Sequence, residues 1–303
     1  MAYVLGLLAS GRANGFTASL LRAAMAGAET VPGVEVEFVH LHQYKFGPCT
    51  SCFNCIRDSE RGCTVDDDMG RDGELMAKVK RANGWILADP VHGWGTSAMS
   101  HLFIERCYPF TWSGELDGMP FASVSCASNQ GMQRLANEEL CKWAFTRGFR
   151  YIGGIPVHTV QIEQAREEAG ELGRRLGEAA TQDASGRGKY PDEEKFVDYL
   201  DKPWSALEPY LENLTSGTMA YKTSLIAEGL ASFKRQEARD LLEASREPFL
   251  EALKLYGEGK AEEACDALVR ASALWTHATW KEFLEEDVVK SGVPGAYRPI
   301  ADD

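Results

Sequence analysis

The sequence predicts an α/β fold, in which helices cover both faces of a parallel sheet, followed by an α-helical extension. Through about residue 180, short apolar runs alternate with stretches whose apolar residues recur at helical spacing. Polar, glycine-containing loops follow several of the apolar runs. After a further polar stretch the remaining pattern is helical. Alternating strands and helices imply parallel strands joined by helical crossovers.

Five short segments have the composition of buried or half-buried strands. They are residues 3–8, 34–39, 85–88, 121–126 and 151–160. Right-handed crossovers bring the carboxyl ends of such strands to one edge of the sheet, so the loops after the first, third and fourth strands should meet there. This is a flavodoxin-like arrangement, in which ligands bind at that edge.

Helices are predicted between these strands. Asp66-Asp67-Asp68 is expected to cap a short helix, and Ser97 to begin a longer one that reaches Phe110. The residues expected on the buried faces of the helices are Leu20, Leu21, Ala24, Met25, Ala28, Leu75, Met76, Val79, Met99, Leu102, Phe103, Phe110, Met132, Leu135, Ala136, Leu140, Trp143, Ile162, Ala165, Ala169, Leu172 and Leu176.

The domain organisation follows from a change in composition. Residues 1–180 form the α/β domain, the polar residues 181–195 are predicted to be a linker, and residues 196–303 form the helical extension. Helices are expected over residues 224–244, 247–256 and 261–284, with a break at Gly257-Glu258-Gly259. The pair around the break resembles one unit of a tetratricopeptide array, but a single unit is weak evidence because such arrays need about three.

Many large apolar residues of the extension should dock on another surface, since proteins rarely expose wide apolar patches. We expect them to cover the ligand edge of the sheet or to build a subunit interface. These residues are Trp204, Phe233, Phe249, Leu253, Tyr256, Leu268, Leu274, Trp275, Trp280 and Phe283.

Composition excludes several classes of function. The net charge of −13 argues against binding to nucleic acid or to an anionic membrane surface. No apolar run approaches the ~20 residues of a membrane span. Without a recognisable leader segment, the eight cysteines favour a reducing, cytoplasmic location and metal or redox use rather than disulfides.

The loop Ala9-Ser10-Gly11-Arg12-Ala13-Asn14-Gly15-Phe16-Thr17 joins the first strand to the first helix. Its glycines let a ligand approach the backbone, and the amides at the start of a helix favour an anion. The loop therefore suits a phosphate group. It contains neither the dinucleotide pattern of glycines nor the Walker pattern. An ordinary turn with a Ser or Thr helix cap is the alternative.

Four cysteines with the spacing Cys49-x2-Cys52-x2-Cys55-x7-Cys63 lie in a loop of residues 47–66. Repeated C-x2-C spacing is typical of [4Fe–4S] sites. Zinc sites more often have two separated pairs, and thiols without a metal are the third alternative. The other four cysteines are interpreted as small core residues. They are Cys107, Cys126, Cys141 and Cys265.

Residues 1 to about 180 resemble the NADPH-dependent FMN reductase-like branch of the flavodoxin superfamily, specifically the iron–sulfur flavoproteins. The motifs that carry this resemblance are residues 10–17, the cysteine motif followed by Asp66-Asp67-Asp68-Met69, residues 89–95, and residues 97–106 ending in Ile104-Glu105-Arg106. The resemblance implies FMN, a [4Fe–4S] cluster on the four cysteines, and dimers or tetramers.

The resemblance also implies the residues around FMN. The phosphate should be held by Ser10, Arg12, Asn14, Phe16 and Thr17. The isoalloxazine should be bordered by Pro90, Val91, His92, Gly93, Trp94 and Gly95, and on its other side by Ala127, Ser128, Asn129 and Gly131. The chain departs from the family pattern in having Gly11 for proline, Phe16 for a small polar residue and His92 for tyrosine.

Two of these residues have alternative roles. His92 is the candidate catalytic residue, because it could stack on the flavin or donate a proton, although a surface histidine would look the same in sequence. Trp94 is expected to stack on the ring, with simple packing as the alternative.

The resulting hypothesis is a cytoplasmic, FMN-dependent redox enzyme with a [4Fe–4S] cluster. It would pass electrons between a reduced donor, with NAD(P)H as one candidate, and an acceptor protein or small-molecule substrate, and it would form homodimers or homotetramers. One alternative is a cluster-free NAD(P)H-dependent reductase of quinone, nitro or azo compounds. Another is a flavodoxin-like binding module without catalysis.

Overall fold

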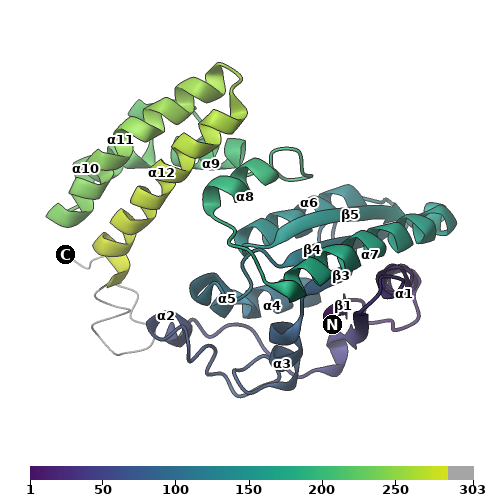
Figure 1. Cartoon of the computed structure of the whole chain (residues 1–303). Helices are drawn as coiled ribbons and strands as arrows, with labels where there is room; N and C mark the ends of the chain where they lie inside the picture. The colour runs from purple at the N-terminus through teal and green to yellow at the C-terminus, as the bar shows by residue number, and fades with distance from the viewer. Residues whose placement is uncertain (286–303) are drawn as a thin grey trace. The chain divides into compact units, whose positions relative to one another are not determined.

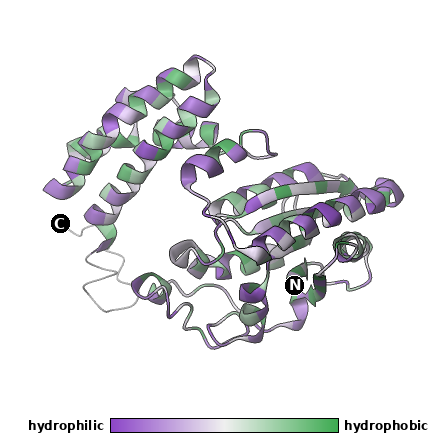
Figure 2. Cartoon of the chain, in the orientation of Figure 1, coloured by the Kyte–Doolittle hydropathy of each residue, from purple (hydrophilic) through white to green (hydrophobic). Residues whose placement is uncertain are grey.

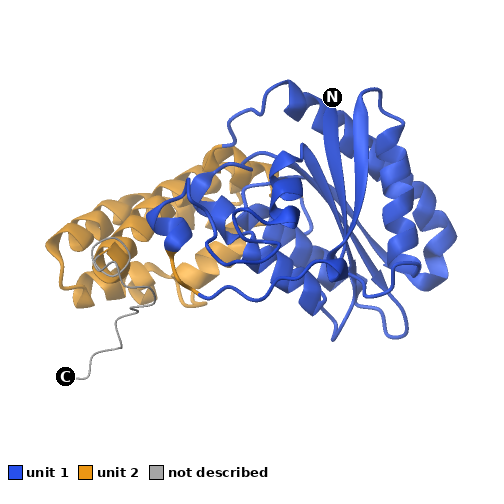
Figure 3. Ribbon diagram, turned by 90° about the horizontal axis from the view of Figure 1, so that it is seen from below, with its two compact units in different colours: residues 1–50, 54–190, 202–204 blue, residues 51–53, 191–201, 205–303 orange. Residues whose placement is uncertain are grey.

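The computed structural model describes residues 1–285 of the chain. It separates into two compact units (Figure 3). Unit 1 comprises residues 1–50, 54–190 and 202–204, and unit 2 comprises residues 51–53 and 191–201 and the chain from residue 205. The short segment Ser51–Phe53 of the cysteine loop is thus grouped with unit 2, while the residues on either side of it belong to unit 1.

Unit 1 contains a five-stranded parallel sheet. Its strands are β1 (Ala2–Leu8), β2 (Val34–His40), β3 (Gly84–Pro90), β4 (Pro120–Ala127) and β5 (Arg150–His158). The strand order is β2-β1-β3-β4-β5, which is the flavodoxin order. Leu8 is in register with both His40 and Ala88, so the carboxyl ends of β1, β2 and β3 lie at one edge. The predicted fold class is therefore confirmed.

Helices cover both faces of this sheet (Figure 1). On one face α1 (Phe16–Glu29) and α7 (Ile162–Ser185) share a core with inward-facing residues of all five strands. On the other face lie α3 (Glu74–Arg81), α4 (Ala98–Arg106), α5 (Tyr108–Ser113) and α6 (Gln133–Thr146). There Trp85 of β3 is fully buried and packs on Phe103 of α4 with ring centroids 5.6 Å apart. Burial of both faces explains the almost continuous apolar runs of β1 and β3.

Three predicted boundaries in unit 1 are wrong. Residues 181–185 are the last turn of α7 rather than linker, and Thr181 Oγ1 donates to the carbonyl of Gly177 there. The helix expected from Ser97 to Phe110 is two helices, because Pro109 begins a new one. Gly73, not an aspartate, precedes the first residue of α3.

Most of unit 2 is helical. Its helices are α8 (Asp192–Asp198), α9 (Leu207–Leu214), α10 (Leu225–Ser232), α11 (Gln236–Gly257) and α12 (Ala261–Thr279), followed by a π-helical turn, Trp280–Leu284. Figure 2 shows hydrophobic and hydrophilic residues alternating along α11 and α12, as expected for packed amphipathic helices. The predicted helices 224–244 and 247–256 are instead divided at residues 233–235, where Glu282 accepts hydrogen bonds from the amides of Lys234 and Arg235.

Several of the large apolar residues of the extension pack within unit 2 itself. The ring of Phe233 lies 6.3 Å from that of Trp275 and 5.2 Å from that of Phe283. Phe249 and Leu268 are fully buried. The expectation of an external surface is therefore wrong for Phe233, Phe249 and Leu268, whereas Phe283 is 53% exposed. No helix within residues 1–285 combines the length and apolar character that a membrane crossing requires.

The contact between α1 and α7 predicts a strong effect of one methyl group. A Cβ added at Gly173 would lie 1.7 Å from the carbonyl oxygen of Ala24, so the helices must separate. Gly173→Ala should lower the free energy of unfolding by about 1–3 kcal/mol, measured by urea denaturation. Gly188→Ala is the matched control, because no atom lies within 4 Å of its added Cβ. Equal stability of the two variants would contradict this packing.

Candidate functional site

Three loops that follow β1, β3 and β4 meet at the carboxyl edge of the sheet. These loops, together with the adjoining ends of β3, β4 and α1, include every residue that the sequence assigned to FMN. In the first loop Ser10 and Thr17 are buried, whereas Arg12, Asn14 and Phe16 are exposed. Ser10 Oγ accepts a hydrogen bond of 3.2 Å from the amide of Arg12. Gly15 occupies the position before α1 and has no side chain to cap the helix, which leaves its first amides for other acceptors.

The second loop ends in a tight turn. His92 and Gly95 exchange backbone hydrogen bonds of 3.0 and 3.1 Å, and the two residues between them, Gly93 and Trp94, have φ of +56° and +70°. Two positive φ values are typical of a type I′ turn, and the second is a strained conformation for tryptophan. The indole of Trp94 is 56% exposed and donates a 3.2 Å hydrogen bond to Oε1 of Gln130 in the third loop. Trp94 therefore connects the second loop to the third.

The third loop begins at Ala127, the last residue of β4, and reaches the start of α6. Ser128 and Asn129 are exposed, and Asn129 and Gly131 both have positive φ. The ring nitrogen Nε2 of His158 lies 3.2 Å from the carbonyl of Asn129. The backbone of this loop is thus held from β5 while its polar side chains face outward.

Asp89 lies beneath the second loop; the sequence places it in the motif of residues 89–95 but assigns it no role. It is fully buried at the end of β3, and its Oδ1 accepts hydrogen bonds from Ser97 N, Ser97 Oγ and Ser100 Oγ at 3.0, 2.6 and 2.5 Å. Its Oδ2 has no hydrogen-bond partner within residues 1–285. Burial raises the pKa of Asp89, and the bonds from Ser100 and Ser97 offset part of that rise.

A small polar network joins the second loop to α6. Oε2 of Glu139 accepts hydrogen bonds from the amide and hydroxyl of Thr96, and His101 Nε2 lies 3.0 Å from that hydroxyl. Burial would raise the pKa of Glu139, but the bonds from Thr96 lower it overall. A pocket of about 370 Å³ lies beside this network, with Trp94 and Trp204 among its lining residues.

The cysteine loop, residues 47–66, contacts the C-terminal end of α4, whereas Asp89 contacts the N-terminal end. Cys49, Cys52, Cys55 and Cys63 are half-buried, and none of the eight cysteines forms a disulfide. Cys55 belongs to the short helix α2 (Asn54–Arg57). Within residues 1–285 no three His, Cys, Asp or Glu side chains are grouped as metal ligands. The remaining four cysteines are buried, as the sequence predicted.

Residues in the last turn of α4 form hydrogen bonds with both ends of the cysteine loop. Buried Arg106 donates to both carboxylate oxygens of Asp67 at 2.6 and 2.8 Å, and to the carbonyl of Gly47 at 2.8 Å. The carboxylate of its neighbour Glu105 accepts from the amide of Cys49. The guanidinium of Arg106 also lies 3.4 Å from Sγ of Cys63. Asp67 is therefore an ion-pair partner rather than the helix cap that the sequence suggested.

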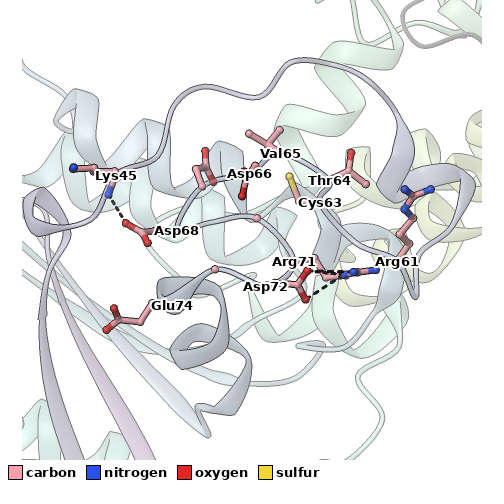
Figure 4. A pocket seen from close by; sticks show the side chains of 13 residues that line it. Lys45, Arg61, Cys63, Thr64, Val65, Asp66, Asp68, Arg71, Asp72 and Glu74 are labelled. Carbon is pink, nitrogen blue, oxygen red and sulfur yellow. Dashed lines mark hydrogen bonds and ion pairs between the residues drawn. The ribbon is translucent and has the colours of Figure 1, made fainter.

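A pocket of about 610 Å³ opens beside Cys63 (Figure 4). Its walls carry charges of both signs, including Asp66, Asp68 and Arg61. Oδ2 of Asp68 accepts a 2.6 Å hydrogen bond from the amide of Lys45, which joins the two sides of the pocket. The fourth cysteine thus lies at a polar, solvent-accessible surface rather than in an apolar interior.

The fold and the three converging loops define the flavodoxin-like class of α/β proteins. The model of the NADPH-dependent FMN reductase family matches residues 2–161, which is more than half of the chain. The chain belongs to this family and is a flavin-dependent oxidoreductase.

Two curated relatives are iron-sulfur flavoproteins. The one from Methanocaldococcus jannaschii is 30% identical over 138 residues, which cover 45% of this chain and 68% of the relative. The one from Archaeoglobus fulgidus is 30% identical over 125 residues, which cover 41% of this chain and 60% of the relative.

Solved structures with similar folds include a flavone reductase, with a TM-score of 0.46 and 19% identity, covering 63% of this chain and 66% of that one. A WrbA-like flavodoxin from Agrobacterium tumefaciens has a TM-score of 0.39 and 14% identity, covering 60% and 99%. The fold assignment rests on the strand order described above.

The ion pair of Arg106 predicts a pH-dependent stability. Burial would raise the pKa of Asp67, but the hydrogen bonds from Arg106 and the Gly47 amide lower it below the ordinary 3.8. The pair therefore contributes stability above pH ~4 and loses it as the pH falls through the lowered pKa. Asp67→Asn should cost about 3 kcal/mol of unfolding free energy at pH 7 and should flatten this acid-side dependence.

Asp66→Asn is the control for this measurement, because Asp66 is exposed and should change stability by less than about 0.5 kcal/mol. If Asp67→Asn and the control unfold at the same urea concentration, the ion pair does not hold the cysteine loop in solution.

Proposed function

We propose that the protein is an FMN-dependent redox enzyme that holds a [4Fe–4S] cluster on Cys49, Cys52, Cys55 and Cys63. It would pass electrons from a reduced donor such as NAD(P)H to an acceptor protein or small-molecule substrate. The observation that carries this proposal is the meeting of the three predicted flavin loops at one edge of the sheet. The family membership and the names of the iron-sulfur relatives support the two cofactors.

The first loop would hold the phosphate of FMN. The side chains proposed for this are Ser10, Arg12, Asn14, Phe16 and Thr17, and the first amides of α1 add the positive end of the helix dipole. Exposed Arg12 is the one cation among them, so it would contribute the charge-assisted hydrogen bond.

The second and third loops would enclose the flavin ring. The residues proposed to border it are Pro90, Val91, His92, Gly93, Trp94 and Gly95 on one side and Ala127, Ser128, Asn129 and Gly131 on the other. Bound FMN supplies the redox chemistry, since a flavin exchanges both single electrons and electron pairs. The imidazole of His92 is exposed on the turn that His92 and Gly95 close. It would hold or deliver a proton for the substrate.

The donor set of the cysteine loop fits an iron–sulfur cluster. Four thiols lie within 15 residues, and the guanidinium of Arg106 lies 3.4 Å from the Sγ of one of them, Cys63. A cluster exchanges single electrons. A cluster-free reductase is the second candidate, and the match to the NADPH-dependent FMN reductase family supports it.

Assembly and location are further proposals. We propose a cytoplasmic homodimer or homotetramer. Three large apolar side chains near the proposed flavin edge are at least 50% exposed in the single chain: Phe16, Trp94 and Leu135. Such exposure supports an edge that a second subunit covers.

The phosphate assignment predicts the effect of removing Arg12. Arg12→Ala should weaken FMN binding by about 1–3 kcal/mol, the range for a hydrogen bond to a charged group, and should leave riboflavin affinity unchanged. Fluorescence titration of the flavin-free protein measures both affinities. Arg239→Ala is the control, since Arg239 is an exposed residue of α11 and lies outside the three flavin loops. Undiminished FMN affinity in Arg12→Ala would remove this residue from the site.

The cluster assignment predicts loss of iron without loss of flavin. Replacing any one of Cys49, Cys52, Cys55 or Cys63 by Ser should abolish or destabilise the cluster in anaerobic preparations, whereas FMN should remain bound because its loops contain none of these thiols. Cys265→Ala, in α12, is the matched control and should retain iron. Full iron content in all four Ser variants would contradict the ligand assignment, and flavin reduction by an iron-free wild type would support the cluster-free reductase.

A further inference from the structure

Two histidines contact the backbone of the first loop from the β2 side. His40 is the last residue of β2 and pairs in register with Leu8 at the end of β1. Its Nε2 lies 2.7 Å from the carbonyl oxygen of Ser10. His42, in the 3₁₀ turn Leu41–Gln43, places Nε2 3.2 Å from the carbonyl oxygen of Ala9. A carbonyl only accepts, so each imidazole must carry its proton on Nε2 and donate it.

These two bonds fix two consecutive peptide planes. In a trans peptide the C=O and the N–H of the next residue point in opposite directions. Since the carbonyls of Ala9 and Ser10 point at the imidazoles, the N–H groups of Ser10 and Gly11 point away from β2. The rings are neighbours, with centroids 5.6 Å apart, and atoms of His42 lie 3.7 and 3.8 Å from the position of a Cβ on Gly11. Together they hold the loop before any ligand binds.

We propose that His40 and His42 are positioning residues that orient the backbone amides of this loop for the phosphate group of FMN. The inference rests on the proposed function, because it takes the first loop as the phosphate site. When the amides of a loop are already aligned, ligand binding does not have to order them. The free energy that ordering would cost therefore appears as higher affinity for the ligand. The benefit falls on the phosphate alone, because the flavin ring is assigned to the other two loops.

The histidines therefore predict selectivity between two ligands that differ only by the phosphate. FMN should lose affinity when a histidine is removed, and riboflavin should not. A general loss of folding would instead weaken both ligands together. This difference separates positioning of the phosphate loop from a merely structural role.

The experiment titrates flavin-free, full-length protein with FMN and with riboflavin. The variants are His42→Leu, His40→Leu and His40→Gln. Glutamine keeps an N–H donor at about the reach of Nε2, so His40→Gln should recover most of the FMN affinity that His40→Leu loses. His42 is exposed, so its replacement should not prevent folding, whereas His40 is buried. His277→Leu, at an exposed position of unit 2, is the control.

Each Leu variant should bind FMN roughly three- to tenfold more weakly, with riboflavin affinity unchanged within about twofold, as expected for the loss of one hydrogen bond. Equal weakening of both flavins, or no weakening of either, would overturn the proposal. If the unmodified protein binds riboflavin as tightly as FMN, the phosphate assignment itself fails, and the role of the histidines fails with it.

Discussion

The bidentate ion pair between Arg106 and Asp67 is the constraint on which the arrangement of the cysteine loop depends. Its side chains are 1% and 14% exposed, so removing either partner would leave a charge away from water. Arg106 reaches Gly47 before the first cysteine, Asp67 after the last, and the thiol of Cys63. One buried side chain thereby closes a 20-residue loop that has little regular structure of its own.

Helix α4 connects this loop to the proposed flavin edge. Its first turn is fixed by Asp89 through Ser97 and Ser100, directly under the loop that should border the flavin ring. Its last turn carries Glu105 and Arg106, which fasten the cysteine loop. A helix of nine residues is about 13 Å long. The two proposed redox sites are therefore attached to opposite ends of one short, rigid element.

Much of the fold was predictable because its signals are local. Strands β1, β3 and β4 are short, largely apolar runs, and β2 alternates apolar and acidic residues. The spacing of the four cysteines indicates a candidate metal site, with zinc and unligated thiols as alternatives. The missed features depend on partners that are distant in sequence: Arg106 with Asp67, and His40 with Ser10, lie 39 and 30 residues apart. The triple aspartate predicts a helix cap, but the tertiary structure brings buried Arg106 to Asp67, and Gly73 precedes α3 instead. Five residues of α7 were assigned to a linker because their polar composition hides their helical packing.

The central claim is that one chain carries a flavin at the sheet edge and an iron–sulfur cluster on the loop fastened by Arg106. The most direct test is chemical analysis of the unmodified protein purified without oxygen, with FMN, iron and acid-labile sulfide measured on the same sample. The account predicts one FMN, four iron and four sulfide per chain. A preparation that binds FMN fully but contains neither iron nor sulfide after anaerobic reconstitution would contradict it.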